Sequence, residues 1–403
     1  MGDDEITVRF VEERDLDAMI RNDLRAFGAD ERKAWIDQRV REDLELDRFV
    51  TAEAGGRTVG NAGAFTFGLT LPGGSEVPVA GVTWVAVAAT HRRRGVMRSM
   101  LDVVHDQARD RGEVAAVLWA AEGSIYGNVG YGPTHREQTV EVPTGVQFRA
   151  DAPTGGSVHF AEPGEARDVL PAVWERVREQ RPGGLRRSEH WWRNVLRRIE
   201  GELAGVDALH HTLVHCDAAG RPDGYASYHS DGKWDPSSGT PNVVWLDQFA
   251  AETPVAHAEL WRVLTSLDLV SHVETDQVPL DDHLPWLLED ARAVRVRQVA
   301  DGMWLRVLDV AGLFGSRSWA TDDLVVVDAG ASGTWRLGAE VQRSDEPADL
   351  SMSPVELGAL SLGGVRVVDL ARAGRVREHE AGAARRLDAL LATDPQPACL
   401  THF

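Results

Sequence analysis

Apolar and polar positions alternate in ways that predict strands and helices up to Val142. Residues 6–11 (ITVRFV) alternate and predict a half-buried strand, and residues 15–25 are predicted to be helical. The near-continuous apolar run 79–89 is typical of a central strand covered on both faces. Another buried strand is predicted at 114–121. Between these two strands, apolar residues at helical spacing predict an amphipathic helix: Met97, Met100, Leu101, Val104 and Ala108.

The rest of the chain divides at a linker and at a change of pattern. Residues 151–157 (DAPTGGS) are predicted to form the linker. Residues 243–275 repeat the strand–helix–strand order of the first segment. A third segment contains the alternating run 301–310 and a helix start in which Ser353 and Glu356 predict a capping box. The pattern predicts an α/β (α+β) chain with domains at 1–150, 151–294 and 295–403.

Composition and charge restrict the partners and the compartment. The net charge of −20 repels nucleic acid and anionic membranes, so we expect neither as a partner. It attracts a cationic small molecule, although solubility alone also accounts for it. No apolar run approaches the roughly 18 residues needed to cross a bilayer, and the acidic start resembles no signal peptide. Cys216 and Cys399 are the only cysteines, which favours a reducing, cytoplasmic location.

A basic turn joins the apolar run 79–89 to the helix that follows. It consists of Arg92, Arg93, Arg94, Gly95, Val96 and Met97. The first turn of a helix leaves backbone N–H groups free, and the helix dipole adds positive charge there. A diphosphate fits such a site, because glycine lets the backbone approach closely and arginine adds charge. The alternative is a basic surface turn on an ordinary α/β unit.

Two other kinds of catalytic site find no support in the sequence. His210 and His211 lack partners at a useful metal-ligand spacing, so we predict no metal. No Gly-x-Ser-x-Gly elbow is present, and no cysteine nucleophile lies near the basic turn. The pattern therefore favours direct group transfer without a covalent enzyme intermediate.

The basic turn resembles that of the Gcn5-related N-acetyltransferase (GNAT) superfamily, whose motif is Arg/Gln-x-x-Gly-x-Gly/Ala. Arg92 and Gly95 match the motif, whereas Met97 replaces its final small residue. The resemblance implies acetyl-CoA as cosubstrate, and a backbone N–H that stabilises the oxyanion of the thioester carbonyl. It places acetyl-CoA on two strand ends, the turn and the helix start: Val85, Ala86, Val87, Arg92, Arg93, Arg94, Gly95, Val96, Met97, Arg98, Ala121 and Glu122. The second segment lacks the turn, so we expect that segment to bind no CoA.

Tyr126 is the predicted catalytic acid. After acyl transfer the leaving group is a thiolate, and a nearby phenol can protonate it. Tyr126 follows the strand 114–121, which in a GNAT fold diverges from the cofactor strand and so places the phenol near the sulfur. Tyr131 is the rival, and we expect it to be packed in the core instead.

Four features resemble one GNAT family in particular, the actinobacterial enhanced-intracellular-survival (Eis) proteins. These are THRRRG (90–95), IYGNVGYG (125–132), DGMWLRVLDV (301–310) and a chain that ends in Phe. The resemblance implies a catalytic GNAT domain, a degenerate second one and a C-terminal sterol-carrier-protein-like domain. It also implies a homo-hexamer, and acetylation of several amines of an aminoglycoside.

The Eis resemblance further implies a catalytic role for the C-terminal carboxylate of Phe403. This carboxylate helps to deprotonate the amine nucleophile, since an ammonium group cannot attack a thioester. An α-carboxyl, with a reference pKa of roughly 3.5, is a weak base, which favours a role in orienting the amine or a bridging water. The family often has an acidic residue before the last position, but this chain has His402, which puts the range of polycationic substrates in doubt.

The remaining substrate-binding candidates are Trp35 and Trp84 as aromatic walls and Asp30 as a source of negative charge. Ordinary packing or solvation accounts equally well for each of them. Two other functions remain open: acetylation of protein lysines or N-termini, and a lipid carrier whose GNAT domains are vestigial. Intact cofactor-turn and Tyr126 residues favour the enzyme over the carrier.

Overall fold

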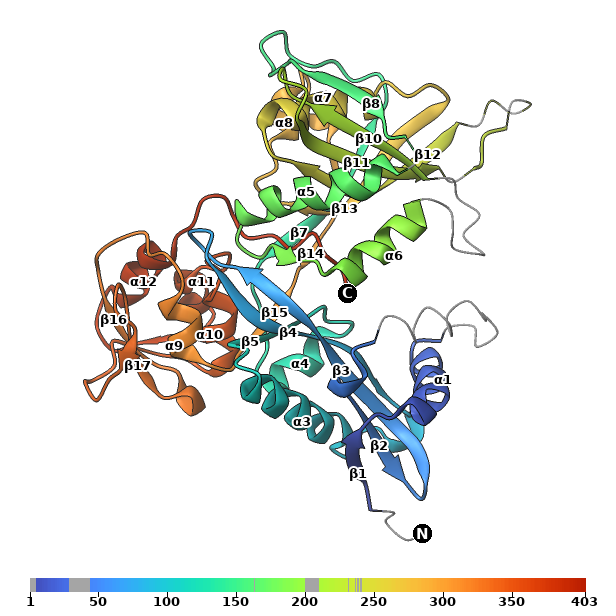
Figure 1. Ribbon diagram of the computed structural model, residues 1–403. Helices are drawn as coiled ribbons and strands as arrows, with labels where there is room; N and C mark the ends of the chain where they lie inside the picture. Colours follow the sequence, from blue (N-terminus) through green and yellow to red (C-terminus); the bar gives the residue numbers. More distant parts are fainter. Residues whose placement is uncertain are drawn as a thin grey trace. The chain divides into compact units, whose positions relative to one another are not determined.

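The computed structural model describes residues 5–28, 44–162, 164–199, 210–230, 232–235, 237, 239 and 241–403. Its contacts divide the chain into two compact units. Unit one comprises residues 1–134, 303–393 and 402–403, and unit two comprises residues 135–302 and 394–401 (Figure 1). The chain therefore passes from unit one to unit two and back twice, and its last two residues belong to unit one.

Unit one begins with a mixed sheet. In spatial order its strands are β1 (Thr7–Phe10), β2 (Phe49–Ala54), β3 (Arg57–Thr70), β4 (Glu76–Val87), β5 (Ala115–Leu118), β15 (Trp304–Val307) and β6 (Gly132–Pro133). The neighbours β4 and β5 run parallel, as expected for strands joined by a helix. The predicted strands at 6–11, 79–89 and 114–121 correspond to β1, β4 and β5.

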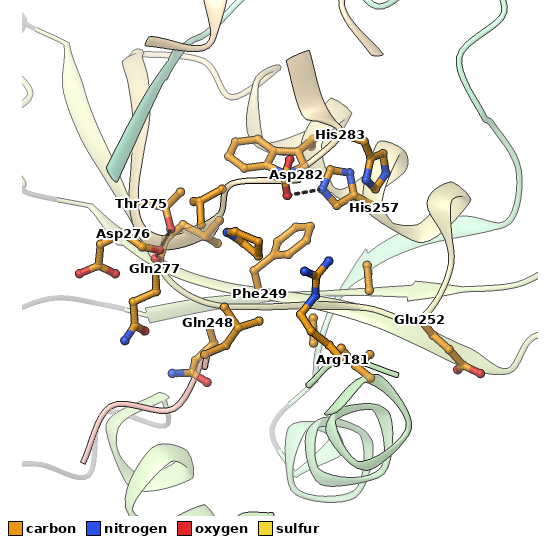
Figure 2. A pocket seen from close by; sticks show the side chains of 18 of the residues that line it. Arg181, Gln248, Phe249, Glu252, His257, Thr275, Asp276, Gln277, Asp282 and His283 are labelled. Carbon is orange, nitrogen blue, oxygen red and sulfur yellow. Dashed lines mark hydrogen bonds and ion pairs between the residues drawn. The ribbon is translucent and has the colours of Figure 1, made fainter. Parts of the chain in front are cut away.

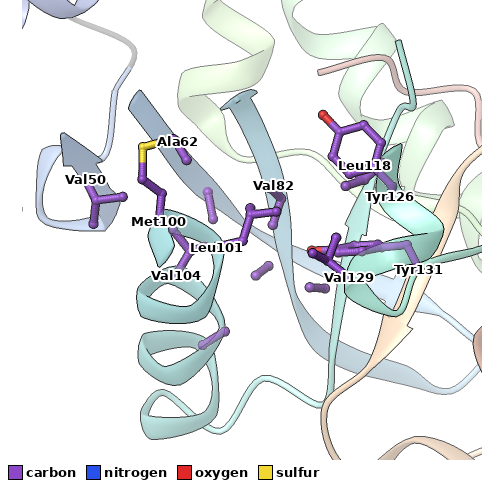
Figure 3. Close-up of a cluster of buried hydrophobic side chains, with 14 of the residues drawn as sticks. Val50, Ala62, Val82, Met100, Leu101, Val104, Leu118, Tyr126, Val129 and Tyr131 are labelled. Atoms are coloured by element: carbon purple, nitrogen blue, oxygen red, sulfur yellow. The ribbon is translucent and has the colours of Figure 1, made fainter. Parts of the chain in front are cut away.

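Helices α1 (Leu16–Ala26) and α3 (Val96–Asp110) cover opposite faces of this sheet (Figure 1). On β2, Phe49 packs in a cluster with α1, while the next residue, Val50, packs in a cluster with α3. Successive strand residues point to opposite faces, so the two helices lie on different sides. The side of α3 that faces the sheet carries the predicted apolar stripe, including Met100 and Leu101 (Figure 3).

Strand β15 completes the first sheet from a distant part of the sequence. It pairs antiparallel with β5, from Trp304 opposite Leu118 to Val307 opposite Ala115, and it also pairs with β6. The sequence pattern had assigned this run to the opening of the third segment. Because backbone pairing is set by strands from both segments, the third segment cannot separate from the first without breaking a sheet.

The remainder of unit one contains a small sheet with helices around it. Its strand order is β18 (Gln342–Arg343), β17 (Thr334–Leu337), β16 (Val325–Asp328), β19 (Leu350–Ser351) and β20 (Arg377–Glu378). The helices are α9 (Val310–Gly315), α10 (Pro354–Leu360), α11 (Val367–Arg372) and α12 (Ala383–Leu391). The predicted capping box is confirmed at α10, where Ser353 caps the helix and Glu356 bonds back to the Ser353 N–H at 3.0 Å.

Unit two has its own mixed sheet. In spatial order the strands are β14 (Arg295–Asp301), β7 (Arg136–Pro143), β13 (Val270–Pro279), β12 (Asn242–Ala251), β11 (Pro222–Ser230), β10 (His210–Cys216) and β8 (Ser157–Phe160). The pair β12 and β13 is parallel. Its helices and one further short strand are α5 (Glu165–Glu179), α6 (Glu189–Ile199), α7 (Pro254–Leu264), α8 (Leu284–Leu287) and β9 (Leu185–Arg186).

Short 3-10 turns link several of these elements. They are Glu13–Asp15, Leu46–Arg48, Ala89–His91, Gly127–Val129, Ala291–Ala293 and Gly330–Ser332. Helix α4 (Gly123–Tyr126) leads directly into the turn at Gly127–Val129. The turn Ala89–His91 follows strand β4, and helix α4 follows strand β5. Both segments therefore belong to the candidate site.

Candidate functional site

The parallel strands β4 and β5 diverge in unit one. Their pairing covers only Val79 to Gly81 on β4, opposite Ala115 to Val117 on β5. Strand β4 continues to Val87, whereas β5 ends at Leu118. Backbone groups of β4 beyond Gly81 therefore have no ladder partner on the β5 side. An extended ligand can therefore form hydrogen bonds with that edge of β4, as an additional strand does.

A bulge in β4 lies beyond the point of divergence. The register with β3 pairs Thr83 with Gly63 and then Ala86 with Asn61, so that Trp84 and Val85 fall outside it. Trp84 has a left-handed backbone, with φ of 54°. Bulges and such backbone angles are common at functional sites because they redirect backbone and side-chain groups. Val85 is one of the predicted cofactor contacts, and both neighbouring ladders leave its backbone unpaired.

Polar side chains hold this bulge in place. The Asn61 side-chain amide donates to the Trp84 carbonyl oxygen at 2.6 Å, and the Asn22 amide donates to Asn61 Oδ1 at 2.6 Å. The Asp23 carboxylate lies 3.4 Å from Asn61 Nδ2. Burial raises the pKa of Asp23 to about 6, against the smaller, opposite effect of the Asn61 hydrogen bond. These α1 and β3 residues were not predicted, because their meeting depends on tertiary packing.

The basic turn connects β4 to α3 through two residues with left-handed backbone. Arg93 has φ of 63° and Gly95, the N-cap of α3, has φ of 81°. Such conformations turn successive backbone N–H groups toward one concave surface, which suits an anion. Gly95 lies in open space, so its conformation, rather than crowding, favours glycine there.

The start of α3 is open to an anionic ligand. No side chain caps the helix, and its first turn contains no acidic residue. Arg92, Arg93 and Arg94 are exposed beside it. Uncapped N–H groups, the helix dipole and exposed arginines together fit a diphosphate. Val96 is buried beneath the helix start, while Arg98 is exposed and donates to the Asn128 carbonyl oxygen at 2.9 Å.

The other predicted cofactor contacts lie along the same two strand ends. Val85 and Val87 are half-buried on β4 and Ala86 between them is buried. Ala121 and Glu122 are exposed directly before α4. Met97, the residue that departs from the GNAT motif, is half-buried and packs against the α3 core. Its side chain therefore turns toward the protein, and the backbone N–H remains available at the turn.

Tyr126 ends helix α4 at the edge of the α3 core. It is 8% exposed and packs edge-on to Tyr131, with ring centroids 6.1 Å apart. Figure 3 shows its ring beside Leu118, the last residue of β5. Burial, followed by the nearby Glu122 carboxylate, raises the pKa of Tyr126. Among the described residues its hydroxyl has no hydrogen-bond partner, so this buried phenol keeps its proton and can donate it.

The hydroxyl of Tyr131 is already used in the core. Tyr131 is fully buried, and its oxygen lies 2.6 Å from His105 Nε2. Arg306, on β15, lies 3.0 Å from His105 Nδ1 and donates to the Val129 carbonyl oxygen at 2.8 Å. Burial lowers the pKa of His105 to about 3, which keeps this imidazole neutral. These contacts give Tyr131 a structural role in the core, as expected from the sequence.

The C-terminal residue docks on β3 and β4 where β4 and β5 begin to diverge. The Phe403 ring lies 5.0 Å from that of Phe67 on β3. A Cβ at Gly81 would clash with the Phe67 ring and approach Phe403 Cε2 to 3.1 Å. Gly81 is also the last β4 residue paired with β5. The terminus is thus held by aromatic packing over a residue that must be small.

His402 stacks on Trp119, the first residue after β5. Their ring centroids are 4.9 Å apart and their planes differ by 24°. The two terminal residues thereby contact both diverging strands of unit one. Trp119 was not singled out from the sequence, because it falls inside the strand predicted at 114–121, whereas β5 ends at Leu118. Nothing in the sequence pointed to Phe67 or Gly81.

Of the three predicted substrate-binding residues, the structure describes only Trp84. Trp35 and Asp30 lie outside the described residues. Trp84 is half-buried and packs with the α1 cluster around Met19 and Phe49, at the bulge described above. Trp84 and the basic turn lie on or after β4, Tyr126 follows β5, and Phe403 packs beside Gly81 of β4, so the candidate site in unit one is defined by these two diverging strands.

Unit two repeats this strand divergence without the basic turn. Strands β12 and β13 pair in parallel only from Asn242 to Trp245 on β12. A cavity of about 250 Å³ lies beyond, lined by β12, β13 and α7 (Figure 2). Only residues 252–253 connect β12 to α7. The Thr253 side chain caps the start of α7, and Pro254, its first residue, has no backbone N–H. No N–H cradle for a diphosphate remains at this helix start.

The structure brings His210 close to two residues that the sequence did not connect with it. The sheet of unit two places His229 and Asp247 beside it, and their side-chain ligand atoms lie within 4.8 Å of one another. The spacing of these residues along the chain hides the cluster, since strand pairing rather than a local motif assembles it.

In the described parts of the chain, every helix is too short or too polar to cross a membrane.

Comparisons with protein families divide the chain into three matched regions. Residues 7–134 match a model described as an acetyltransferase (GNAT) domain, and residues 183–307 match another with the same description. Residues 310–400 match a sterol carrier protein domain. The predicted order of domain types is confirmed.

Individual proteins and a solved structure match most of the chain. An uncharacterized N-acetyltransferase of Streptomyces avermitilis is 38% identical over 89% of this chain and 90% of its own. The N-acetyltransferase Eis of Mycobacterium tuberculosis is 36% identical over 85% of each chain. The crystal structure of Eis1 from Mycobacterium abscessus is 28% identical, with a TM-score of 0.88 over 99% of this chain and 100% of its own.

Proposed function

The chain belongs to the Eis family of GNAT N-acetyltransferases, and from that premise we propose that it acetylates several primary amines of a polycationic small molecule, with aminoglycosides as the substrate class. The observation that carries the proposal is the convergence of three elements on the diverging strands of unit one. These are the uncapped glycine turn, Tyr126 and the docked C-terminus.

Acetyl-CoA binds along β4 and the start of α3. The turn around Arg93 and Gly95 offers backbone N–H groups and exposed arginine charge to the pyrophosphate. The pantetheine arm pairs with the β4 edge at Val85, Ala86 and Val87, which β5 leaves open. An N–H of the bulge at Val85 polarises the thioester carbonyl and stabilises the developing oxyanion.

Transfer proceeds directly within a ternary complex. The amine lone pair attacks the thioester carbonyl carbon, and the tetrahedral adduct collapses as the carbon–sulfur bond breaks. The departing thiolate takes the proton of the Tyr126 hydroxyl. The raised pKa of Tyr126 keeps that proton in place until the thiolate forms.

The carboxylate of Phe403 orients the amine and receives its proton through water. Its ring contact with Phe67 fixes the position of the carboxylate near the point where β4 and β5 diverge. A terminal carboxylate is a weak base, so its main contribution is to hold an ammonium or a bridging water in position. The adjacent His402 replaces the acidic residue common in the family and narrows the range of polycations that bind well.

The charge of the chain supports a cationic substrate. With a net charge of −20, the protein attracts polyamines electrostatically and raises their rate of encounter. Unit two lacks the diphosphate cradle, so we assign it no donor site. We also propose the division at 1–150, 151–294 and 295–403, the cytoplasmic location and the hexamer. A molar mass of six chains, measured by light scattering, would support the hexamer, and a mass of one chain would contradict it.

The test measures release of free CoA thiol from acetyl-CoA with aminoglycosides, small polyamines and lysine peptides. We expect rapid release with several aminoglycosides, and mass spectrometry should show more than one acetyl group added per molecule. Release with peptides alone would assign the chain to protein acetylation instead. Binding of acetyl-CoA without release for any acceptor would overturn the proposed substrate class, and a lipid-bound C-terminal domain in the same preparation would favour the carrier function.

A further inference from the structure

Two histidines and an aspartate of unit two lie together on one face of its sheet. They come from three neighbouring strands: His210 from β10, His229 from β11 and Asp247 from β12. His210 and His229 are direct partners in the β10–β11 register. Cross-strand partners point to the same side, so both imidazoles project from the same face.

A β-bulge brings Asp247 to that face. The β11–β12 register pairs Tyr228 with Leu246 and then Ser227 with Gln248, which leaves Asp247 as the extra residue. His229 pairs with Trp245, two residues before Asp247, so Asp247 lies beside the histidine pair. Bulges redirect a side chain in this manner next to functional sites.

The three side chains converge within metal-ligand distance. One nitrogen of each imidazole and one carboxylate oxygen all lie within 4.8 Å of one another. Asp247 Oδ2 is 2.7 Å from His229 Nδ1 and 3.4 Å from His210 Nε2. The second distance exceeds the usual range for an N–H···O hydrogen bond, so this carboxylate oxygen does not bond both rings well.

We propose that His210, His229 and Asp247 bind a divalent transition-metal ion, with zinc as the expected occupant. Two imidazole nitrogens and one carboxylate oxygen form a ligand set suited to zinc and its neighbours, and unsuited to calcium or magnesium. An ion among the three ligand atoms satisfies all of them at once. The site rests on these contacts alone and is independent of the acetyltransferase site in unit one.

Exposure of the cluster is compatible with metal entry. The His210 side chain is 4% exposed, which fixes one ligand, whereas His229 and Asp247 are 27% and 22% exposed. An ion can therefore reach the ligands from solvent and keep water at its remaining positions. Bound there, it links β10, β11 and β12, so its expected role is to stabilise unit two.

The experiment uses the full chain with any affinity tag removed, after treatment with EDTA and desalting. Cobalt(II) is titrated and its visible absorption recorded, and zinc(II) is then added in competition and measured by calorimetry. We expect one ion per chain, displacement of cobalt by zinc, and a higher melting temperature with zinc. Absence of saturable binding at one ion per chain would overturn the proposal.

Variants assign the binding to these side chains. Asp247→Asn keeps a hydrogen-bond acceptor but loses the charge, and His229→Gln removes a ligand at a partly exposed position. Each should weaken zinc binding by at least about tenfold and abolish the zinc-dependent rise in melting temperature. Unchanged zinc affinity in Asp247→Asn overturns the site.

His159→Gln provides the matched control. His159 also contacts a carboxylate, Glu165, at 2.9 Å, but it lies outside the cluster. Its substitution should leave zinc affinity unchanged. A loss as large as that of His229→Gln would assign the ion to dispersed surface histidines and reject the three-strand site. Because none of these residues belongs to the unit-one site, failure here does not affect the proposed acetyltransferase function.

Discussion

Units one and two both contain a strand, a helix and a second strand parallel to the first. In unit one these are β4, α3 and β5, and in unit two β12, α7 and β13. In each unit the strands pair over a short stretch and then diverge. The main difference lies in the connection: residues 88–95 in unit one, and residues 252–253 in unit two.

That connection decides which divergence can hold a diphosphate. In unit one, Gly95 leaves the first N–H groups of α3 uncapped. In unit two, Thr253 accepts from the Ala256 N–H at 3.1 Å, and Pro254 contributes no N–H at all. Glu252 adds negative charge beside that helix start, although Arg176 pairs with it at 2.7 Å. The same framework therefore leaves helix N–H groups uncapped by a side chain in unit one and capped in unit two, which is why we propose unit one as the donor site.

The largest expected effect tests the proposed catalytic acid of unit one, Tyr126. Tyr126→Phe should lower turnover by roughly 10²- to 10³-fold, because the departing thiolate loses its proton donor. Acetyl-CoA affinity should change little, since the turn is untouched. Stopped-flow or steady-state thiol release, with calorimetry for donor binding, measures the two quantities.

Tyr131→Phe is its matched control. The Tyr131 hydroxyl contacts His105 in the core, so its loss should cost about 1–3 kcal/mol of stability while turnover of the folded enzyme stays near wild type. If Tyr131→Phe and Tyr126→Phe reduce turnover equally, the assignment of Tyr126 as the acid is wrong.

The second-largest expected effect concerns the C-terminal residue, Phe403. Deleting Phe403 removes the ring that packs on Phe67 and moves the carboxylate away from the diverging strands. We expect turnover to fall by about 10- to 100-fold, since misplacing a group by about an ångström has effects of that order. Extending the chain by two glycines keeps the ring but displaces the carboxylate, and should do the same. Wild-type turnover in both variants would remove the carboxylate from the mechanism.

Local patterns predicted the parts of the site that are contiguous in sequence. Periodicity indicated the strands on either side of the turn around Gly95, and the resemblance to GNAT proteins singled out that turn and Tyr126, all within residues 79–126. The insertion of β15 into the first sheet was missed, because an alternating run does not reveal its pairing partner. A family resemblance, rather than any spacing, indicated the role of Phe403.

Features assembled by tertiary contacts were beyond sequence reasoning. The stack of His402 on Trp119 joins positions far apart in the chain. The cluster of His210 with His229 and Asp247 depends on strand register and on one bulge. Neither has a characteristic spacing, so each becomes visible only once the sheets are formed.

The third effect acts on the turn that distinguishes the two units. Gly95→Asp places a Cβ on a residue with φ of 81° and a carboxylate where the pyrophosphate would bind. We expect the KM for acetyl-CoA to rise by about tenfold or more, with a smaller change in turnover at saturation. Pro254→Ala, at the first helical position of α7 in unit two, should leave that KM unchanged. Equal effects of the two substitutions would mean that both units bind the donor.

The smallest expected effect separates stability from catalysis in unit two. Glu137, on β7, has a buried Oε2 without a hydrogen-bond partner among the described residues. Burial, and then the carboxylates of Asp276 and Asp301, raise the pKa of Glu137 to about 8. The folded chain thus keeps this proton at pH values where the unfolded chain has lost it. The stabilisation that protonated Glu137 contributes to the folded chain is complete below the ordinary glutamate pKa. It is lost as the pH rises through about 8, the pKa of Glu137 in the folded chain.

Glu137→Gln removes this titration while preserving the shape of the side chain. The variant should be more stable than wild type by about 1–2 kcal/mol at pH 9, a value reduced from the full pKa shift because Glu137 is only half-buried. Near pH 4.5 the two proteins should differ little. Denaturant unfolding across this pH range measures the difference, and thiol release at pH 7 should match wild type. A parallel pH dependence in both proteins would show that Glu137 ionises normally, and a loss of turnover would place a catalytic function in unit two.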